Sequence, residues 1–400
     1  MRLLIIAGTP GLLSVGNIYN GGGWIASLQT YLLKKYKDSL DLALIHFNAE
    51  YTDTIKDGCR YYSVPLAKKQ FVNYSRKEKL YKQKLLEVVN KESPDVILCF
   101  GTEMPFALIQ EMTDIPVVIH MQGLLAPISE FLLPHAMSWR SYLMNICRFF
   151  NYIIWKKNTE REKRILVSAK YVLGRTEWDE KISYMMSPQA KYFYCSEIIR
   201  PVIYESSKIW KHQERDTKTI VSIISSPFYK GADVILRCAN VLKEYLGHNF
   251  TWNVYGITQA KEMIKLCNVK PENVNVHFCG IINSQQLIDV ICDADVFVHP
   301  SYIENSPNAV CEAQLLGIPV VATNVGGTSS IIEHNLTGIL VPSNDIYLMA
   351  ANIQKLINNS VFSSRLGVAG REAALERHNP EKITENLMTI LNKIIRKHSN

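Results

Sequence analysis

Two carboxylates, Glu304 and Glu312, lie in the segment YIENSPNAVCEAQLLGIPVV, whose other side chains are mostly apolar or small. A carboxylate that accepts hydrogen bonds from sugar hydroxyl groups forms charge-assisted bonds. A phosphate is bound well by a helix N-terminus, because the first backbone N–H groups have no partner within the helix. The segment therefore predicts a nucleotide-sugar site, with one acid on the ribose, the other on a second sugar and the diphosphate between them. A simpler alternative is that Glu304 is a solvated loop acid and that Glu312 pairs with a nearby base.

The pattern around these acids predicts a strand, a loop and a short helix. The strand is DVFVHPS. Ser306 suits the N-cap of the helix and Pro307 suits its first position, where the missing N–H costs nothing. Gly317 predicts the end of the helix after about three turns. The backbone N–H groups of Asn308 and Ala309 are then the donors that we expect to face a phosphate.

Three further loops have the composition of an anion-binding site. Lys230–Gly231 separates the strand SIIS from an amphipathic helix, and a lysine in such a loop can reach a diphosphate as a point charge. Gly326–Gly327 follows the strand PVVAT, and Gly21–Gly23 precedes a helix, where glycine lets the backbone approach an anion closely. A plain turn explains any one of these glycine runs, but several at corresponding places favour a phosphate site.

Short apolar runs alternate with helix-length amphipathic segments along the chain. The runs are continuously apolar, which is typical of parallel strands covered by helices on both faces. The pattern starts again after EIIRPVIYE, and 400 residues are too many for one ordinary core. The sequence therefore predicts an α/β protein with two doubly wound domains, over residues 1–200 and 201–378. A C-terminal helix over 379–400 is expected to return to the first domain. The predicted strands are RLLIIAG, LALIHF, DVILCF, PVVIHMQG, YVLGRT and AKYFYCSE in the first half, and TIVSIIS, TWNVYG, NVHFCG, DVFVHPS, PVVATNVGG and GILVP in the second.

Residues 124–164 interrupt this alternation. They are rich in aromatic and basic side chains and contain no predicted strand. A basic, aromatic helical segment can lie on an anionic membrane surface. The same composition can equally serve packing inside the first domain, so both interpretations stay open.

The composition is that of an ordinary globular protein with a net charge of +7. This charge suits an anionic small ligand, a phospholipid surface or nucleic acid. Because the basic residues are dispersed and no recognition module is present, a nucleic-acid partner is not expected. The nine cysteines contain no Cys-x-x-Cys pair, which indicates no zinc site and a reducing, cytoplasmic compartment. MRLLIIAGTPGLL predicts a first strand rather than a signal peptide, and no apolar stretch reaches the ~18 residues of a membrane helix.

Taken in order, the motifs of the second half resemble those of the retaining glycosyltransferases of family 4. They are Lys-Gly at 230–231, Glu-x7-Glu at 304–312, GIPVVAT, Gly-Gly at 326–327 and LTGILVP. The resemblance is continuous over residues 218–345 and looser in the first domain. There, GRTEWDEKI and YFYCSEIIRPVIY are similar to enzymes from bacterial surface-polysaccharide gene clusters. The resemblance implies the GT-B fold, in which two Rossmann-like domains face each other across a cleft, with the acceptor on the first and the nucleotide sugar on the second.

The resemblance also implies roles for single residues. Glu312 would bind the ribose, Glu304 would contact the transferred sugar near its anomeric carbon, and Lys230 would stabilise the leaving diphosphate. His120, at the end of PVVIH, corresponds to a histidine beside the donor sugar, although a hydrogen-bonded histidine at a strand end is the alternative. His120, Lys230 and Glu304 form the implied catalytic set. The implied donor-binding set is Gly22, Gly23, Lys230, Ile282, Asn305, Ser306, Asn308, Ala309 and Glu312.

The chain departs from the family pattern at two positions. Ser225 stands where the family has an arginine five residues before the lysine. This removes one phosphate-binding charge, unless Arg175 or Arg200 replaces it. Ser330 stands where an acid often follows the Gly-Gly pair. Both departures leave the donor preference open.

The activity that the resemblance implies is transfer of a sugar from a nucleotide diphosphate sugar to a hydroxyl of a saccharide or lipid-linked saccharide. The implied setting is surface polysaccharide synthesis, in the cytoplasm or at the inner face of the membrane, which residues 124–164 would contact. No cofactor and no metal are expected, because fixed protein charges act on the diphosphate. The Asp-x-Asp at Asp293–Asp295 immediately precedes a predicted strand and is read as its start.

Three other functions are alternatives to this one. A nucleotide-sugar 2-epimerase shares the architecture but lacks this lysine and the Glu-x7-Glu spacing. A non-catalytic nucleotide-sugar-binding protein is left open by Ser225. A dinucleotide-dependent dehydrogenase needs Gly-x-Gly-x-x-Gly directly after a strand, and GGGW does not fit that pattern.

Overall fold

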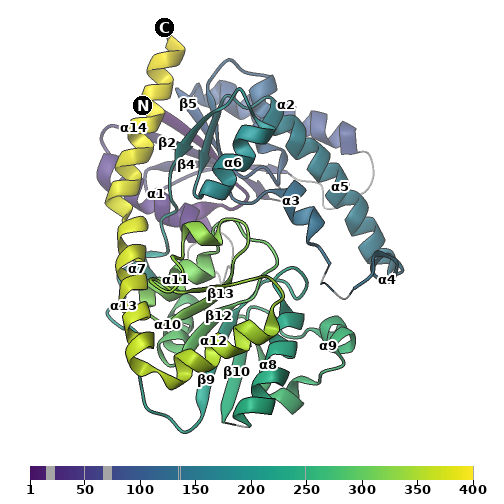
Figure 1. Ribbon diagram of the computed structural model, residues 1–400. Helices are drawn as coiled ribbons and strands as arrows, with labels where there is room; N and C mark the ends of the chain where they lie inside the picture. The colour runs from purple at the N-terminus through teal and green to yellow at the C-terminus, as the bar shows by residue number, and fades with distance from the viewer. Residues whose placement is uncertain are drawn as a thin grey trace. The chain divides into compact units, whose positions relative to one another are not determined.

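The computed structural model of the chain describes residues 1–14, 23–48, 50–65, 74–133, 135, 137–247 and 249–399. These residues form two compact units, whose elements are shown in Figure 1. The first unit comprises Met1–Ser129, Ile146–Ile198 and His378–Asn400, and the second comprises Glu130–Asn145 and Ile199–Arg377.

The first unit contains an eight-stranded sheet with the order β3-β4-β2-β1-β5-β6-β7-β8. All six strands predicted for this half are present, and the neighbouring pairs are parallel except for β3 with β4. The strands are β1 (Arg2–Ile6), β2 (Asp41–Asn48), β3 (Thr52–Lys56), β4 (Cys59–Pro65), β5 (Val96–Phe100), β6 (Val117–His120), β7 (Tyr171–Gly174) and β8 (Lys191–Tyr194).

The antiparallel hairpin of β3 and β4 is absent from the sequence prediction. Its turn is Asp57–Gly58, and both residues are left-handed, with φ of 51° and 79°. Asp-Gly is a strong signal for a two-residue hairpin, because that turn requires positive φ at both positions. The signal was therefore present in the sequence, and β3 adds an antiparallel edge strand to an otherwise parallel sheet.

Helices cover both faces of this sheet. In β1, Leu3 and Ile5 join the apolar cluster that contains α1 and α14, whereas Leu4 and Ile6 join the cluster that contains α2 and α5. Because successive side chains point to opposite faces and both faces are buried, the run is apolar throughout. The helices are η1 (Gly11–Ser14), α1 (Gly23–Tyr36), α2 (Tyr74–Glu92), η2 (Pro105–Glu111), α3 (Leu125–Glu130), α5 (Ile146–Val167), α6 (Glu177–Met186) and α14 (Pro380–Ser399).

The second unit contains a six-stranded sheet with the order β11-β10-β9-β12-β13-β14, in which all neighbours are parallel. The six strands predicted for this half are all present. They are β9 (Lys218–Ile223), β10 (Phe250–Tyr255), β11 (Val276–Gly280), β12 (Val296–His299), β13 (Val320–Thr323) and β14 (Ile339–Val341). The helices are α4 (Trp139–Leu143), α7 (Pro201–Tyr204), α8 (Ala232–Leu246), α9 (Lys261–Cys267), η3 (Pro271–Val274), α10 (Ser284–Cys292), α11 (Asn308–Leu316), η4 (Thr328–Ser330), α12 (Ile346–Asn358) and α13 (Ser360–Arg377).

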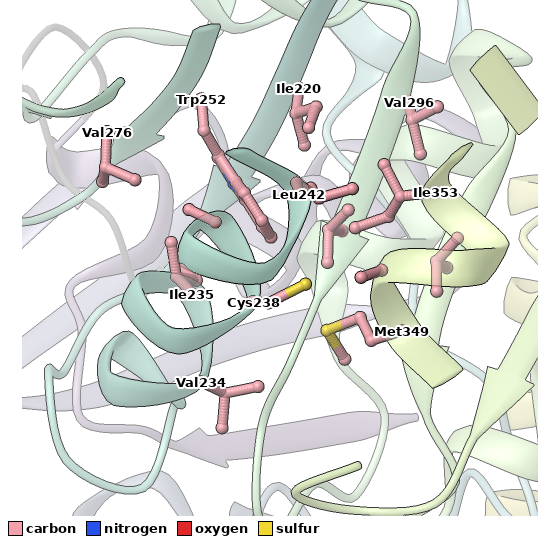
Figure 2. Close-up of a cluster of buried hydrophobic side chains, with 14 of the residues drawn as sticks. Ile220, Val234, Ile235, Cys238, Leu242, Trp252, Val276, Val296, Met349 and Ile353 are labelled. Atoms are coloured by element: carbon pink, nitrogen blue, oxygen red, sulfur yellow. The ribbon is translucent and has the colours of Figure 1, made fainter. Parts of the chain in front are cut away.

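The largest apolar cluster of the second unit lies between its sheet and the helices α8 and α12 (Figure 2). Trp252 of β10 is fully buried there, and its Nε1 donates to Ser222 Oγ at 3.0 Å. Ser222 Oγ donates in turn to the carbonyl of Val298 at 2.6 Å. This polar chain satisfies the indole N–H and joins three neighbouring strands inside the core. Met349 and Ile353 of α12 face the cluster from the other side (Figure 2).

Residues 124–164 contain helices and, among the described residues, no strand, as the sequence predicts. α3 and α5 belong to the first unit and α4 to the second. Within the described part of the chain, no helix is both long and apolar enough to cross a membrane.

Truncation of Ile353 tests the packing of this core. Ile353 is fully buried between α12 and the sheet. Ile353→Ala is expected to lower the unfolding free energy of the second unit by about 2–5 kcal/mol, because it removes buried methyl groups and leaves a cavity. Ile353→Val, which removes one methylene, should cost about 0.5–1.5 kcal/mol. Denaturant unfolding followed by tryptophan fluorescence and circular dichroism measures both, and equal losses in the two variants would contradict the packing described.

Candidate functional site

The strand order reverses once in the second unit. The order β11-β10-β9 is followed by β12-β13-β14, so the reversal lies between β9 and β12. Ligands of doubly wound sheets bind outside the carboxyl ends of the strands at such a reversal. The loop after β9 carries Lys230 and the loop after β12 carries Glu304. The two loops that flank the reversal therefore supply these two predicted site residues.

The half-buried Lys230 and the buried Glu304 form an ion pair. Lys230 Nζ lies 2.6 Å from Glu304 Oε1, and the exposed fractions of the two side chains are 16% and 7%. His299 ends β12 and places its Nε2 2.7 Å from the same carboxylate oxygen. Ser301 Oγ lies 3.1 Å from that ring nitrogen. One oxygen of Glu304 therefore faces an ammonium group and an imidazole at the same time.

The two charges of the pair stabilise each other. Burial disfavours the ionised carboxyl, but Lys230 and His299 outweigh it and hold the pKa of Glu304 well below its usual range. Burial also opposes the charge on Lys230, but Glu304 outweighs it and raises the pKa of the lysine above its ordinary value. Both groups are therefore ionised at neutral pH. Glu304 is not the solvated acid of the simpler alternative.

Close backbone contacts fix these loops. A Cβ on Gly231, which has φ +77°, would lie 2.2 Å from the carbonyl oxygen of Pro300. A Cβ on Gly326, which has φ +53°, would lie 1.8 Å from the carbonyl oxygen of Glu304. The Gly327 N–H donates to that same carbonyl at 3.1 Å. Gly231 and the Gly326–Gly327 pair therefore position the loops that carry the ion pair.

The helix of the two-acid segment, α11, begins one residue later than predicted. Pro307 is its N-cap, with φ −72° and ψ 104°, so the prediction of Ser306 as N-cap and Pro307 as first helical residue is wrong. The φ of proline suits either position, and here its extended ψ places it outside the helix. The predicted end at Gly317 is confirmed, since this residue is left-handed with φ 83°. Asn308 is exposed and Ala309 half-buried at the first turn, which contains no acid.

Glu312 is paired with a base, as the simpler alternative proposes. Arg200 Nε donates to Glu312 Oε1 at 3.0 Å, and Nη2 donates to the same oxygen. Arg200 Nη1 donates to Ser284 Oγ at 2.9 Å. Burial raises the pKa of Glu312, while the attraction of Arg200 opposes that rise. The arginine engages only Oε1, so Oε2 remains outside these bonds.

The remaining predicted donor residues lie around this site or outside the described chain. Asn305 and Ser306 are buried in the loop between β12 and α11. Ile282 is half-buried after β11 and packs against the apolar cluster of α10 and α11. Gly23 is the first residue of α1 in the first unit, whereas Gly22 and its neighbour Gly21 lie outside the described residues.

The structure shows where Ser225, Ser330 and the Asp-x-Asp lie. Ser225 is exposed after β9. Neither candidate replacement stands free for a phosphate: Arg200 engages Glu312, and Arg175 donates to the Gln122 carbonyl in the first unit. Ser330 lies in η4. The interpretation of Asp293–Asp295 as the start of a strand is confirmed, because the second aspartate accepts from the Thr219 N–H at 2.7 Å immediately before β12 begins.

In the first unit, His120 ends β6 and is almost fully buried. Its ring stacks on Phe100, with 5.4 Å between centroids, and lies 5.0 Å from the ring of Trp24. Burial and the charge of Arg175 lower the pKa of His120 to about 3, so the imidazole is neutral at neutral pH. Its Nδ1 has no hydrogen-bond partner among the described residues. A backbone hydrogen bond to Met121 also acts on the ring, so His120 fits the alternative of a hydrogen-bonded histidine at a strand end as well as a residue whose Nδ1 is open to a ligand.

The sequence analysis missed Glu103, which follows β5 in the first unit. The strand order there reverses between β1 and β5, so Glu103 lies at that unit's own reversal. A Cβ on Gly101 would lie 2.2 Å from Glu103 Oε2, and one on Gly123 would lie 2.9 Å from Oε1. The Glu103 carboxyl group therefore packs against the backbone of two glycines, Gly101 and Gly123. Burial raises the pKa of Glu103 to about 7, helped by the nearby Glu162 and opposed by backbone N–H groups.

His299 was also missed, although its position carried a signal. It is the last residue of the predicted strand DVFVHPS, at the carboxyl end where site residues collect. The partner of Glu312 carried no such signal, because Arg200 and Glu312 are 112 residues apart in the chain.

Comparison with known families shows what the second unit is similar to. Residues 205–373 match the family described as glycosyl transferases group 1. Among curated proteins, the capsular polysaccharide biosynthesis glycosyltransferase CapM of Staphylococcus aureus is 32% identical over 102 residues, which is 26% of this chain and 27% of CapM. The chain spans about half the length or less of the curated relatives it matches, between 27% and 56% in the eight compared.

Solved structures match almost the whole chain. Sucrose-phosphate synthase of Thermosynechococcus elongatus superposes with a TM-score of 0.75, at 15% identity, over 99% of each chain. HepE of Anabaena, solved with UDP and glucose, superposes with a TM-score of 0.64, at 15% identity, over 98% of this chain and 99% of that one. These matches confirm the GT-B fold, and the family match confirms the resemblance drawn from the motifs.

Substitution of Gly326 tests whether the glycine pair positions Glu304. Gly326→Ala is expected to destabilise the second unit more than Gly247→Ala. Both glycines are left-handed, with φ of 53° and 61°, but only a Cβ on Gly326 meets the Glu304 carbonyl, while one on Gly247 meets no atom within 4 Å. Gly247→Ala should be destabilising through backbone strain alone, because φ 61° with ψ −130° is a conformation that glycine adopts far more readily than alanine. Denaturant unfolding measures both, and equal costs would show that the contact with Glu304 does not constrain the loop.

Because the pKa of Glu103 is raised, we expect Glu103→Gln to increase the unfolding free energy by an amount that depends on pH. Between the ordinary carboxyl value of 4.5 and about 7, the folded protein binds a proton that the unfolded chain has released. Stability of the native chain should therefore fall as pH rises through this window. Glu103→Gln should not show that loss. The difference in unfolding free energy between this variant and the native chain should therefore grow from pH 4.5 to about 7 and then stay constant. Glu87→Gln, at an exposed site on α2, is the control. Parallel pH profiles for native chain and Glu103→Gln in denaturant unfolding would contradict the assignment.

Proposed function

From the match of residues 205–373 to the glycosyl transferases group 1, we propose that the chain is a retaining glycosyltransferase. It transfers a sugar from a nucleotide diphosphate sugar to a hydroxyl group of a saccharide acceptor. The observation that carries the proposal is the partly buried Lys230–Glu304 pair at the strand-order reversal of the second unit. That pair provides an ammonium group and a carboxylate, both ionised, at the place where this fold binds ligands.

Lys230 is the residue that acts on the leaving group. When the bond to the anomeric carbon breaks, negative charge grows on the diphosphate, and an ammonium group held in a desolvated loop stabilises it. The N-terminus of α11 supplies a second positive end. The N–H groups of Asn308 and Ala309 belong to the first turn, where no intrahelical acceptor exists. Fixed protein charges supply this stabilisation, and no metal or cofactor is part of the proposal.

Glu304 is proposed to act on the transferred sugar. Positive charge grows at the anomeric carbon as the leaving group departs, and a carboxylate kept ionised by Lys230 and His299 stabilises that charge. The sugar is held so that its hydroxyl groups donate to the same carboxylate. In the first unit, His120 is proposed to contact the donor sugar as a neutral imidazole, because its Nδ1 has no partner among the described residues.

Glu312 is proposed to bind the ribose while keeping its bond to Arg200. The guanidinium occupies Oε1, and Oε2 is available to accept from ribose hydroxyl groups. The positive partner lowers the cost of keeping the buried carboxylate ionised. Ile282, Asn305 and Ser306 are proposed as further donor-binding residues of the second unit, and Gly23, at the start of α1, as one of the first unit.

The acceptor is proposed to be a growing surface polysaccharide, in soluble or lipid-linked form. This rests on the similarity to CapM, whose name places it in capsular polysaccharide biosynthesis. The reaction is proposed to take place in the cytoplasm or at the inner face of the membrane. A uridine diphosphate sugar is the first donor to test, because HepE was solved with UDP and glucose.

A donor screen by thermal shift, followed by transfer assays, tests the proposal. A nucleotide sugar at about 100 times its Kd should stabilise the chain by about 2.7 kcal/mol. Lys230→Ala and Glu304→Gln should lower kcat/KM by about 10²- to 10³-fold. Lys211→Ala and Glu372→Gln, at exposed positions of the same unit, are the matched controls. Circular dichroism confirms that each variant folds.

Each result has one meaning. Full transfer activity in Glu304→Gln would overturn its catalytic role. Stabilisation by donors with no transfer to any acceptor would favour a nucleotide-sugar-binding protein. Interconversion of a UDP-sugar without an acceptor would favour the epimerase. Retention or inversion at the anomeric carbon is read from the product by NMR, and an inverted product would contradict the proposed mechanism.

A further inference from the structure

A stripe of apolar side chains on α5 faces outward. Ile146, Phe149, Phe150 and Ile153 follow the i, i+3, i+4, i+7 spacing, which places them on one face of the helix. Ile146 is 65% exposed, Phe149 41% and Phe150 47%. The two phenylalanine rings contact each other edge to face, with 5.8 Å between centroids. This spacing normally marks the side of a helix that packs on a core, and here it marks the exposed side.

The opposite side of α5 is the side that packs. Thr159, Glu162, Ile165 and Leu166 are buried within the first unit. Glu162 Oε1 accepts from Thr102 Oγ1 at 2.6 Å and from the Leu125 N–H at 2.9 Å, and its Oε2 accepts from the next N–H of α3. The C-terminal half of α5 is thus anchored firmly. In Figure 1 its first turns lie away from the strands of the first unit.

Positive charge continues the outward face. Lys156 and Lys157, about one turn after Ile153, are exposed. Between Glu130 and Glu160 the sequence contains no acidic residue, and it contains four basic ones, which are Arg140, Arg148, Lys156 and Lys157. An apolar, aromatic stripe followed by basic residues, in a stretch of sequence without acids, is typical of a helix at a lipid–water interface. Lysine is instead depleted at interfaces between proteins, which argues for lipid as the occupant.

We propose that α5 docks the chain onto the surface of an anionic phospholipid bilayer. Ile146, Phe149 and Phe150 insert at the boundary between headgroups and acyl chains, and Lys156 and Lys157 contact the lipid phosphates. The docking is peripheral, since within the described residues no helix could cross a membrane. The proposal goes beyond the transfer reaction and stands without it, although a lipid-linked acceptor would be met at this surface.

Flotation of the full chain with lipid vesicles tests the docking. The chain should bind vesicles in which about a third of the lipid is phosphatidylglycerol, bind pure phosphatidylcholine vesicles at least about tenfold more weakly, and lose binding as salt is raised. The double variant Phe149→Ser/Phe150→Ser should lower the partition coefficient by about tenfold or more. Lys156→Glu/Lys157→Glu should lower it by a similar factor for anionic vesicles only.

The matched control is Tyr347→Ser/Leu348→Ser, at two exposed apolar positions of α12 in the second unit, which should bind as the native chain does. Thermal shift with the nucleotide sugar should be unchanged in both phenylalanine and lysine variants, so a failure of docking is distinguishable from a failure of the donor site. Equal binding to neutral and anionic vesicles, or no loss in Phe149→Ser/Phe150→Ser, would overturn the proposal. So would a dimer, seen by sedimentation, that this double variant dissociates.

Discussion

The partly buried ion pair of Lys230 and Glu304 is the interaction on which the second unit's site depends. Removing two charges from water costs several kcal/mol for each, and their attraction returns this only when the geometry is good. A pair of this kind is therefore weak evidence for stability and better evidence for function. The surrounding structure maintains the geometry: His299 adds a third group to the shared oxygen, and the Gly326 contact holds the backbone of the glutamate.

Sheet topology brings these residues together. The lysine and the glutamate are 74 residues apart in the chain, yet their loops follow the adjacent strands β9 and β12. Two helices leave in opposite directions from such a pair of strands, so a space opens above the strand ends that side chains from both loops can share. The first unit repeats the principle with Glu103, after β5 at its own reversal. The same rule therefore accounts for the position of titratable groups in both units.

Much of the fold was predictable, because strands buried on both faces are continuous apolar runs that local sequence reveals. The loops with Lys230, Glu304 and the glycine pair were predictable for a related reason, since they follow such strands directly. Pairing between distant segments was harder. The bond of Arg200 to Glu312 depends on a fold-level contact, and no local pattern announces it. The β3–β4 hairpin, in contrast, could have been predicted, because Asp57–Gly58 is a local signal for a two-residue turn.

The corrected start of α11 bears on how a diphosphate could be held. Lys230 and Arg200 balance Glu304 and Glu312, so these four side chains carry no net charge before a ligand arrives. Because Ser225 stands in place of an arginine, backbone N–H donors would have to stabilise more of the negative charge of a diphosphate. A serine N-cap would have used one of those donors for its own side-chain oxygen. Pro307 caps the helix without any side-chain hydrogen bond, and the first turn contains no acid to repel an anion. The feature that the sequence analysis misassigned is thus the one that keeps the helix N-terminus available.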